Sequence, residues 1–402
     1  MIKKSIMLLS ALLLLASCMG GGADSFSDLQ PVPFRYASLL KVSRNDSVIV
    51  ADIMNPWAVD TTAVLHHYEI KKPFRNTVVY TSVHSGLFTE LGCLGAISGL
   101  GDTQYINLPV LREGLEKGTI KDCGGSMEPN IEAIIDLRPD AIFLSPFENA
   151  GSYGKVGKLG IPIVECADYM EHIPLGRAEW MRFYGMLLGC EEEADSLFAQ
   201  VEGEYLRLKQ MVENGDGNYN GNGDGNVNGN GNEGQRPLAP SSLRGGVDNG
   251  NDSLRGGVDN GNPTVLTEMK IGNTWYVAGN DSYVGNMIRD AGGRYVFSSV
   301  KGAGAQPYSP EEVFDVAQQA DVWMFKYSQE TDKTLQQLAE EWPNNNRIKA
   351  WQTKNTYGCN LLKNAFFEET PFHPDVLLKD FITIFHPGII KGHSLRYYKK
   401  LK

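Results

Sequence analysis

Residues 127–143 read MEPNIEAIIDLRPDAIF, and this stretch predicts the fold class. Its apolar residues Ile131, Ile134 and Ile135 follow helical spacing. The helical pattern stops at Arg138, because the proline that follows disfavours helical geometry in the residue before it. An apolar run over residues 141–144 comes next and predicts a buried strand. A helix that leads directly into a buried strand is a unit of an α/β fold.

A second stretch repeats this pattern. Residues 308–325 read YSPEEVFDVAQQADVWMF, and residues 311–316 follow the same order of acidic and apolar side chains as residues 132–137. Asp321 again opens an apolar run. The repeat predicts two similar α/β lobes, and a chain of 402 residues also favours two domains.

The N-terminus has the layout of a secretory signal. Lys3 and Lys4 precede an apolar run over residues 6–16 that is too short to span a bilayer. The Leu-Ala-Ser-Cys that follows resembles a bacterial lipobox, so we expect residues 1–17 to be removed and Cys18 to carry a lipid. The protein is then exported and lipid-anchored in the cell envelope, facing the periplasm or the cell surface. Cleavage of a plain signal peptide nearby is the alternative.

Composition excludes some partners and metal sites. The chain has 37 basic and 48 acidic residues, a formal charge of −11, and such a surface repels nucleic acid. None of the five cysteines after Cys18 is spaced as CxxC, which argues against a zinc site. An exported protein can form disulfides, but an odd number of cysteines leaves at least one thiol free. The sequence alone does not select the pair.

Composition also divides the chain. Residues 213–262 are rich in Asn and Gly and contain a tandem repeat, so we expect a disordered insert there. Residues 191–212 predict a backbone helix about 33 Å long. The other expected parts are a tether with a hairpin at 18–74, a lobe at 75–174, connecting helices over 175–212 and a second lobe at 263–402. Two lobes joined by one long helix imply a ligand cleft between the lobes.

Five segments resemble the periplasmic substrate-binding proteins of ABC importers for ferric siderophores, haem and cobalamin. They are EPNIEAIIDLRPDAIF, the long helix, WYVAGNDSYVGNMIRDAGGRYVF (275–297), YSPEEVF and HPDVLLKDFITIFHP (373–387). The resemblance covers residues 75–212 and 263–387. It implies a monomer with no catalytic activity and no intrinsic cofactor. Such a protein captures an iron or cobalt complex and delivers it to a membrane permease and its ATPase.

The resemblance also implies a role for the repeated Glu. In this family one surface Glu on each lobe docks into the permease, and the matching positions here are Glu132 and Glu311. Glu312 is a substitute for the second of them. The alternative is that a Glu in the first turn of a helix merely favours the helix dipole.

Ligands of α/β lobes bind beyond the carboxyl ends of the strands. The aromatic, polar and cationic side chains expected there are Ser82, His84, Tyr105, Ser145, Tyr153, Lys326, Asn360 and Phe366. Imidazole ligates iron and cobalt, so His84 is the candidate metal ligand. Its alternative role is a hydrogen bond at the start of a helix. Ser126 and Ser145 stand where cobalamin binders of the family carry Trp, which disfavours cobalamin.

Other functions stay open beside this one. Cobalamin binding belongs to the same family, and an adhesion lipoprotein could retain the same fold. A bare metal-ion binder requires three or four converging ligands, and His84 is the only well-placed His of the first lobe. A surface hydrolase would use His84 with a Ser and an Asp, but the sequence has no GxSxG motif.

Overall fold

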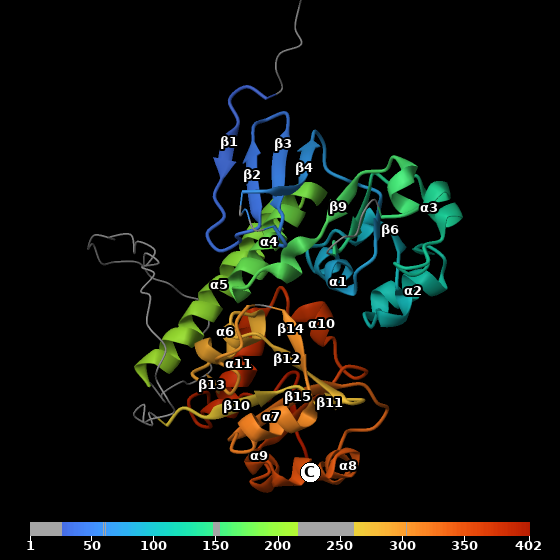
Figure 1. Cartoon of the computed structure of the whole chain (residues 1–402). Coiled ribbons are helices and arrows are strands. Elements are labelled where there is room, and N and C mark those ends of the chain that lie inside the picture. The colour runs from blue at the N-terminus through green and yellow to red at the C-terminus, as the bar shows by residue number, and fades with distance from the viewer. Residues whose placement is uncertain (1–25, 59, 61, 148–152, 216–260, 303) are drawn as a thin grey trace, which may run out of the picture. The chain divides into compact units, whose positions relative to one another are not determined.

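The computed structural model describes residues 26–58, 60, 62–147, 153–215, 261–302 and 304–402. The predicted signal peptide, Cys18 and residues 216–260 of the insert lie outside the described residues. The chain divides into two compact units, with the boundary between Phe198 and Ala199. Each unit is α/β, and the boundary falls within one long helix, α5 (Glu191–Asn214) (Figure 1). The predicted fold of two α/β lobes and one long helix is confirmed.

The first lobe is built on a parallel five-stranded sheet in the order β7-β6-β5-β8-β9. Its strands are β5 (Thr77–Val79), β6 (Ile97–Leu100), β7 (Lys121–Asp122), β8 (Ala141–Leu144) and β9 (Ile163–Glu165). Val78, Val79, Ile142 and Phe143 have no exposed surface, as expected for a parallel sheet covered on both faces. Strand order reverses between β5 and β8, and α/β sheets bind ligands at such a switch point.

The helices of the first lobe include the one predicted from the repeated segment. They are α1 (Ser82–Glu90), α2 (Pro109–Glu116), α3 (Ile131–Leu137) and α4 (Pro174–Leu188). Helix α3 ends at Arg138, whose φ of 48° is left-handed, and β8 begins at Ala141 as predicted. Helix α1 begins directly after Thr81, whose side chain accepts the N–H of His84 and caps the helix.

The second lobe repeats the plan. Its main sheet has the order β13-β10-β15-β16-β17, with β17 antiparallel, and a smaller sheet has the order β11-β12-β14. The strands are β10 (Thr264–Thr267), β11 (Lys270–Ile271), β12 (Thr274–Ala278), β13 (Arg294–Tyr295), β14 (Ala305–Tyr308), β15 (Val322–Tyr327), β16 (Thr356–Asn360) and β17 (Lys399–Lys400). The helices are α6 (Tyr283–Asp290), α7 (Pro310–Ala317), α8 (Leu335–Glu341), α9 (Lys349–Gln352), α10 (Phe366–Glu369) and α11 (Pro374–Phe385).

One aspartate performs the same task in each lobe. The Asp140 carboxylate accepts the backbone N–H groups of Arg75 and Asn76 at 2.8 and 3.1 Å, directly before β5. The Asp321 carboxylate accepts the N–H and the hydroxyl of Thr264 at 2.8 and 2.7 Å, at the first residue of β10. Each Asp thus ties the strand that follows the repeated helix to its neighbouring parallel strand.

Residues before β5 form a four-stranded antiparallel sheet rather than the predicted single hairpin. Its strands, in the order β1-β2-β3-β4, are β1 (Gln30–Val32), β2 (Leu40–Arg44), β3 (Ile49–Met54) and β4 (Val64–Ile70).

Two buried carboxylates hold the connection from β1 to β2. Glu179 on α4 accepts the N–H groups of residues 35, 36 and 37 at 2.7–2.9 Å. Glu171 accepts those of residues 38 and 39 at 3.0 and 2.8 Å. Glu179 and Glu171 are 0% and 2% exposed, so neither could be buried as an anion without such donors. The sheet is thereby fastened to the first lobe.

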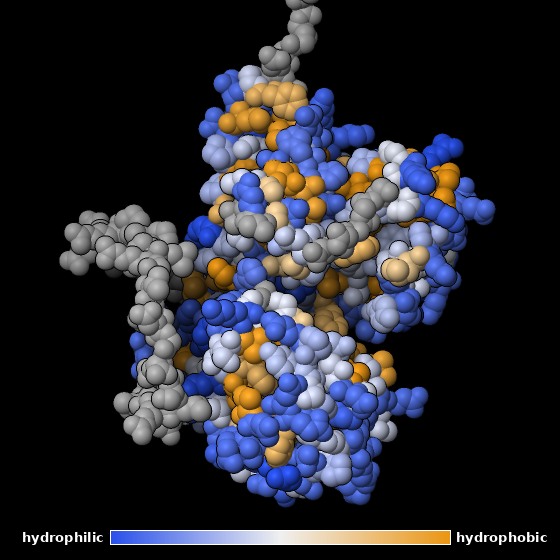
Figure 2. Space-filling view, viewed as in Figure 1, coloured by the Kyte–Doolittle hydropathy of each residue, from blue (hydrophilic) through white to orange (hydrophobic). Residues whose placement is uncertain are grey.

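Charged and polar residues cover most of the surface visible in Figure 2, with separate hydrophobic patches between them. Within the described ranges, none of the helices combines the length and the apolar character that crossing a bilayer requires.

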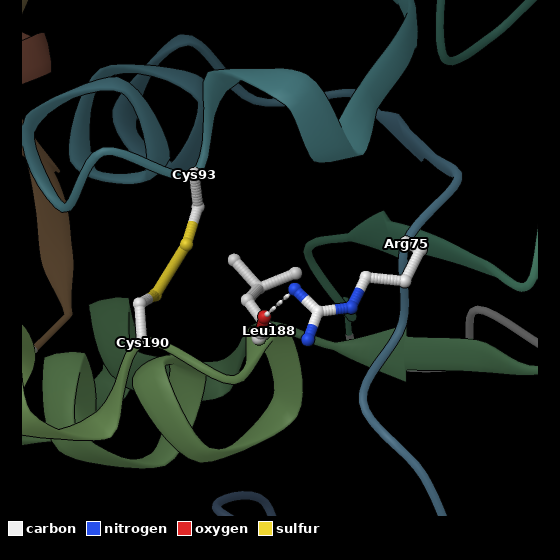
Figure 3. Close-up of a disulfide and its surroundings, with 4 residues drawn as sticks. All are labelled: Arg75, Cys93, Leu188 and Cys190. Carbon is white, nitrogen blue, oxygen red and sulfur yellow. Dashed lines mark hydrogen bonds between the residues drawn. A yellow bond between two sulfur atoms is a disulfide. The ribbon is translucent and has the colours of Figure 1, made fainter.

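A disulfide joins Cys93, after α1, to Cys190, directly before α5 (Figure 3). Beside it, the guanidinium of Arg75 donates to the carbonyl oxygen of Leu188 at 3.3 Å. The three other described cysteines are free and buried. The disulfide therefore supplies the pair that the sequence left open, and it fixes the start of the long helix to the first lobe.

Replacing Cys93 and Cys190 by Ser is expected to destabilise the first lobe strongly. The two cysteines are separated by 97 residues, and closing a loop of about this length stabilises a fold by about 4–5 kcal/mol. Urea unfolding of both proteins measures the difference. Reductant should lower the stability of the wild type and leave the double variant unchanged. Equal midpoints for oxidised wild type and double variant would contradict the assignment.

Candidate functional site

The first lobe contains a cavity of about 780 Å³ at the carboxyl ends of β5, β6, β7 and β8. It therefore lies at the switch point of the sheet. Its walls combine aromatic, hydroxyl and charged side chains. The lining residues are Tyr80, Thr81, Asp102, Ser126, Met127, Glu128, Pro129, Leu144, Ser145, Phe147, Tyr153, Gly154, Lys155 and Val156.

Close packing fixes the wall of the cavity after β5. The Tyr80 hydroxyl donates to the carbonyl oxygen of Cys123 at 2.9 Å. Its ring packs against Gly101, where a Cβ atom would lie only 1.9 Å from the ring, so any larger residue would displace Tyr80. Burial raises the pKa of the Cys123 thiol to about 12, which keeps this thiol protonated and unreactive.

The loop after β6 presents Asp102 to the cavity. Asp102 has a left-handed φ of 48°, and its N–H donates to the carbonyl oxygen of Gly124 at 3.0 Å. Both of its carboxylate oxygens lie 3.2 Å from the N–H nitrogen of Ser126. The loops that follow β6 and β7 thus hold each other in place.

Three large side chains form the apolar part of the cavity. Phe147 and Met127 are 55% and 87% exposed although both are apolar. Tyr153 has a left-handed φ of 53°, and its hydroxyl donates to Glu165 at 2.6 Å. Burial, together with the hydrogen bond to Glu165, raises the pKa of Tyr153 well above its usual value, so its hydroxyl stays protonated. The exposed Phe147 and the partly exposed Tyr153 offer aromatic surface that suits a large planar or macrocyclic ligand.

His84 does not line the cavity, which contradicts its predicted place among the ligand-binding residues. The side chain is 2% exposed and lies in the first turn of α1. Its Nε2 donates to Asp168 at 2.8 Å, and its Nδ1 contacts the hydroxyl of Thr81. Both ring nitrogens are engaged, which fits the alternative role at a helix start rather than that of a metal ligand.

Asp168 is the centre of this buried group. It has no exposed surface and also accepts hydrogen bonds from Tyr184 at 2.9 Å and Arg177 at 3.2 Å. Burial alone would raise the pKa of Asp168, but the attraction of His84 and Arg177 holds the pKa below its usual value. The group therefore joins the wall residue Thr81 to α4.

Two other predicted residues of the first lobe lie elsewhere. Tyr105 is 66% exposed and is not among the residues that line the cavity. Ser82 follows the lining residue Thr81 but begins α1 instead of lining the cavity. Ser145 and Tyr153 do line it, as does Ser126.

The predicted residues of the second lobe already have partners there. Lys326 forms an ion pair with Glu268 and lies 5.8 Å from the ring centre of Phe366. Phe366 is buried against Tyr397 and Tyr398. Asn360 is also buried, and its amide donates to the carbonyl oxygen of Gln329 at 2.7 Å. Asn360 therefore shapes a loop and is not open to a ligand.

Sequence reasoning missed Asp102 and Lys155. The strand before Asp102 reads ISGL, whose central glycine weakens a strand pattern, so its carboxyl end was not recognised. Lys155 follows no strand directly. Among the described residues, no cluster of three or more His, Cys, Asp or Glu side chains is arranged to hold a metal ion.

The repeated glutamates occupy equivalent places. Glu132 and Glu311 are the second residues of α3 and α7, and both are exposed. Glu312 is different, because its carboxylate accepts the N–H and the hydroxyl of Ser309, both at 2.8 Å. These two bonds lower the pKa of Glu312. Glu312 therefore caps α7 and is a poor substitute for Glu311 at a protein surface.

Comparisons with known proteins agree with the fold. An uncharacterized lipoprotein of Methanocaldococcus jannaschii is 24% identical over 82% of this chain and 70% of its own length. A periplasmic heme binding protein from Pseudomonas aeruginosa superposes with a TM-score of 0.56 at 12% identity, over 82% of this chain and 98% of that one. An ABC-type Fe3+-hydroxamate transport protein from Saccharomonospora viridis superposes with a TM-score of 0.53 at 15% identity, over 80% and 96%.

The family model described as periplasmic binding protein matches residues 78–222 and 254–360, which is more than half of the chain. These segments contain the parallel sheet of the first lobe, the long helix and strands β10 to β16. The chain belongs to the periplasmic binding protein family.

Proposed function

We propose that this protein is the substrate-binding lipoprotein of an ABC importer. It captures a metal complex, a ferric siderophore or haem, and delivers it to the membrane permease. Cobalamin is the second candidate, since it belongs to the same class of large metal complexes. The observation that carries the proposal is the first-lobe cavity, whose position at the switch point and exposed Phe147 side chain suit a large ligand.

The names of similar proteins support this class of cargo. The superposing structures include a heme binding protein and a protein of a Fe3+-hydroxamate transport system. The lipoprotein relative supports an anchor at Cys18, which fits the lipobox pattern. Glu132 and Glu311 support delivery to a permease, because equivalent exposed carboxylates on the two lobes would meet equivalent basic sites on a transporter.

Thermal unfolding of the mature protein tests the cargo class. The panel contains haem, cobalamin and ferric complexes of hydroxamate and catecholate siderophores. A cargo present at about 100 times its dissociation constant should stabilise the fold by about 2.7 kcal/mol. If no compound shifts the transition, the proposed cargo class is wrong.

Phe147→Ala should weaken the same ligand shift. Removing one aromatic face from the cavity should cost about 1 kcal/mol of binding free energy. Phe26→Ala is the matched control, because Phe26 is also an exposed aromatic residue and does not line the cavity. An equal loss of affinity in both variants would place the ligand outside this cavity.

Delivery is tested with Glu132→Ala combined with Glu311→Ala. The ligand shift should stay unchanged, whereas stimulation of the transporter ATPase should fall several-fold because the docking charges are missing. Asp136→Ala with Asp315→Ala is the control, since these exposed residues lie one turn further along the same two helices. Normal stimulation by the Glu variant would refute the docking role.

A further inference from the structure

Three charged side chains line the first-lobe cavity: Asp102, Glu128 and Lys155. Within the described part of the chain, none of the three forms an ion pair. Among the described residues, the lining therefore carries two negative charges and one positive charge that have no ion-pair partner. The chain as a whole also has a formal charge of −11, which repels anions approaching from solution.

Asp102 is the best placed of the three to act on a ligand. It is partly buried, whereas Glu128 and Lys155 are exposed, so solvent and salt screen its charge less. Its backbone is held by the hydrogen bond to Gly124, and within the described residues its carboxylate accepts one N–H, that of Ser126. An ionised carboxylate has about four acceptor sites, so capacity remains for a donor on the ligand.

The cationic residue expected in the second lobe does not change this balance. Lys326 is already paired with Glu268, so its charge is neutralised within its own lobe. Anionic ligands are best bound by Arg or Lys side chains that have no acidic partner. Among the described residues, Lys155 is the one such side chain that lines the cavity. A ligand with several negative charges would leave Asp102 and Glu128 facing like charge.

We infer that this cavity selects metal complexes with a positive or zero net charge, and that Asp102 is the specificity-determining residue that receives a cationic hydrogen-bond donor of the ligand. The inference rests on the proposed function and narrows it. Haem carries propionate groups, and ferric tris-catecholates are strongly anionic. Ferric trihydroxamates are neutral, or cationic when they carry a free amine, so they are the class that fits.

The test uses two probes that differ in one charge. The first is a ferric trihydroxamate with a free terminal ammonium group, and the second is the same complex acetylated at that amine. Calorimetric titration of the full mature protein measures both dissociation constants. The ammonium form should bind about tenfold more tightly, the ratio expected for one charged hydrogen bond. Higher salt should reduce this ratio.

Asp102→Asn should bring the ratio close to one, because the ammonium group of the ligand loses its charged acceptor. Asparagine keeps the shape and can still accept the N–H of Ser126, so the loop is preserved. Asp136→Asn is the matched control, because this exposed residue of α3 lies outside the cavity lining and its change removes the same charge. The control should keep the wild-type ratio.

Two outcomes would overturn the inference. The first is equal affinity for both probes in the wild type, and the second is a preference that survives in Asp102→Asn. A failure of this inference can be distinguished from a failure of the proposed function. If neither probe binds while haem or the anionic catecholate complex does, charge selection is wrong and the transport function stands. If no metal complex binds, the proposed function fails as well.

Discussion

Each lobe is organised by one carboxylate that faces the start of a neighbouring strand. Asp140 accepts backbone N–H groups of the two residues directly before β5, and Asp321 accepts that of the first residue of β10. Hydrogen bonds to a charged acceptor are among the stronger contacts in a protein, and here they set the register between the two central parallel strands. The carboxyl ends of those strands then lie together, and in the first lobe this is where the cavity opens. The position of the cavity at the carboxyl ends of the strands thus depends on hydrogen bonds at their amino ends.

Much of this architecture could be predicted from the sequence, because it rests on local patterns. The repeated helix-to-strand segment predicted α3, β8, α7 and β15, and the long helix was recognised from spacing and from acidic residues at its start. The environment of His84 was harder to predict, because Thr81 caps α1 and thereby places His84 inside the helix.

The site was harder to predict than the fold. Its members come from loops that follow four different strands, and their contacts are set by backbone geometry that a single sequence does not show. Asp102 and Tyr153 both adopt left-handed backbone conformations, which are infrequent for residues other than glycine. Such strain is characteristic of functional sites and is visible only in three dimensions. His84 was expected to be a metal ligand because of its imidazole. It is buried against Asp168 instead and has a structural role.

The fastening of residues 35–39 to Glu179 and Glu171 has a mechanical consequence. With the lipid anchor proposed at Cys18, drag from the surroundings would act as tension along the N-terminal end of the chain. The tension reaches these consecutive N–H groups before it reaches the parallel sheet. Because several bonds to two buried anions must break together, the load is shared among them. The lobe that carries the cavity is thereby protected from tension applied to the N-terminal end of the chain.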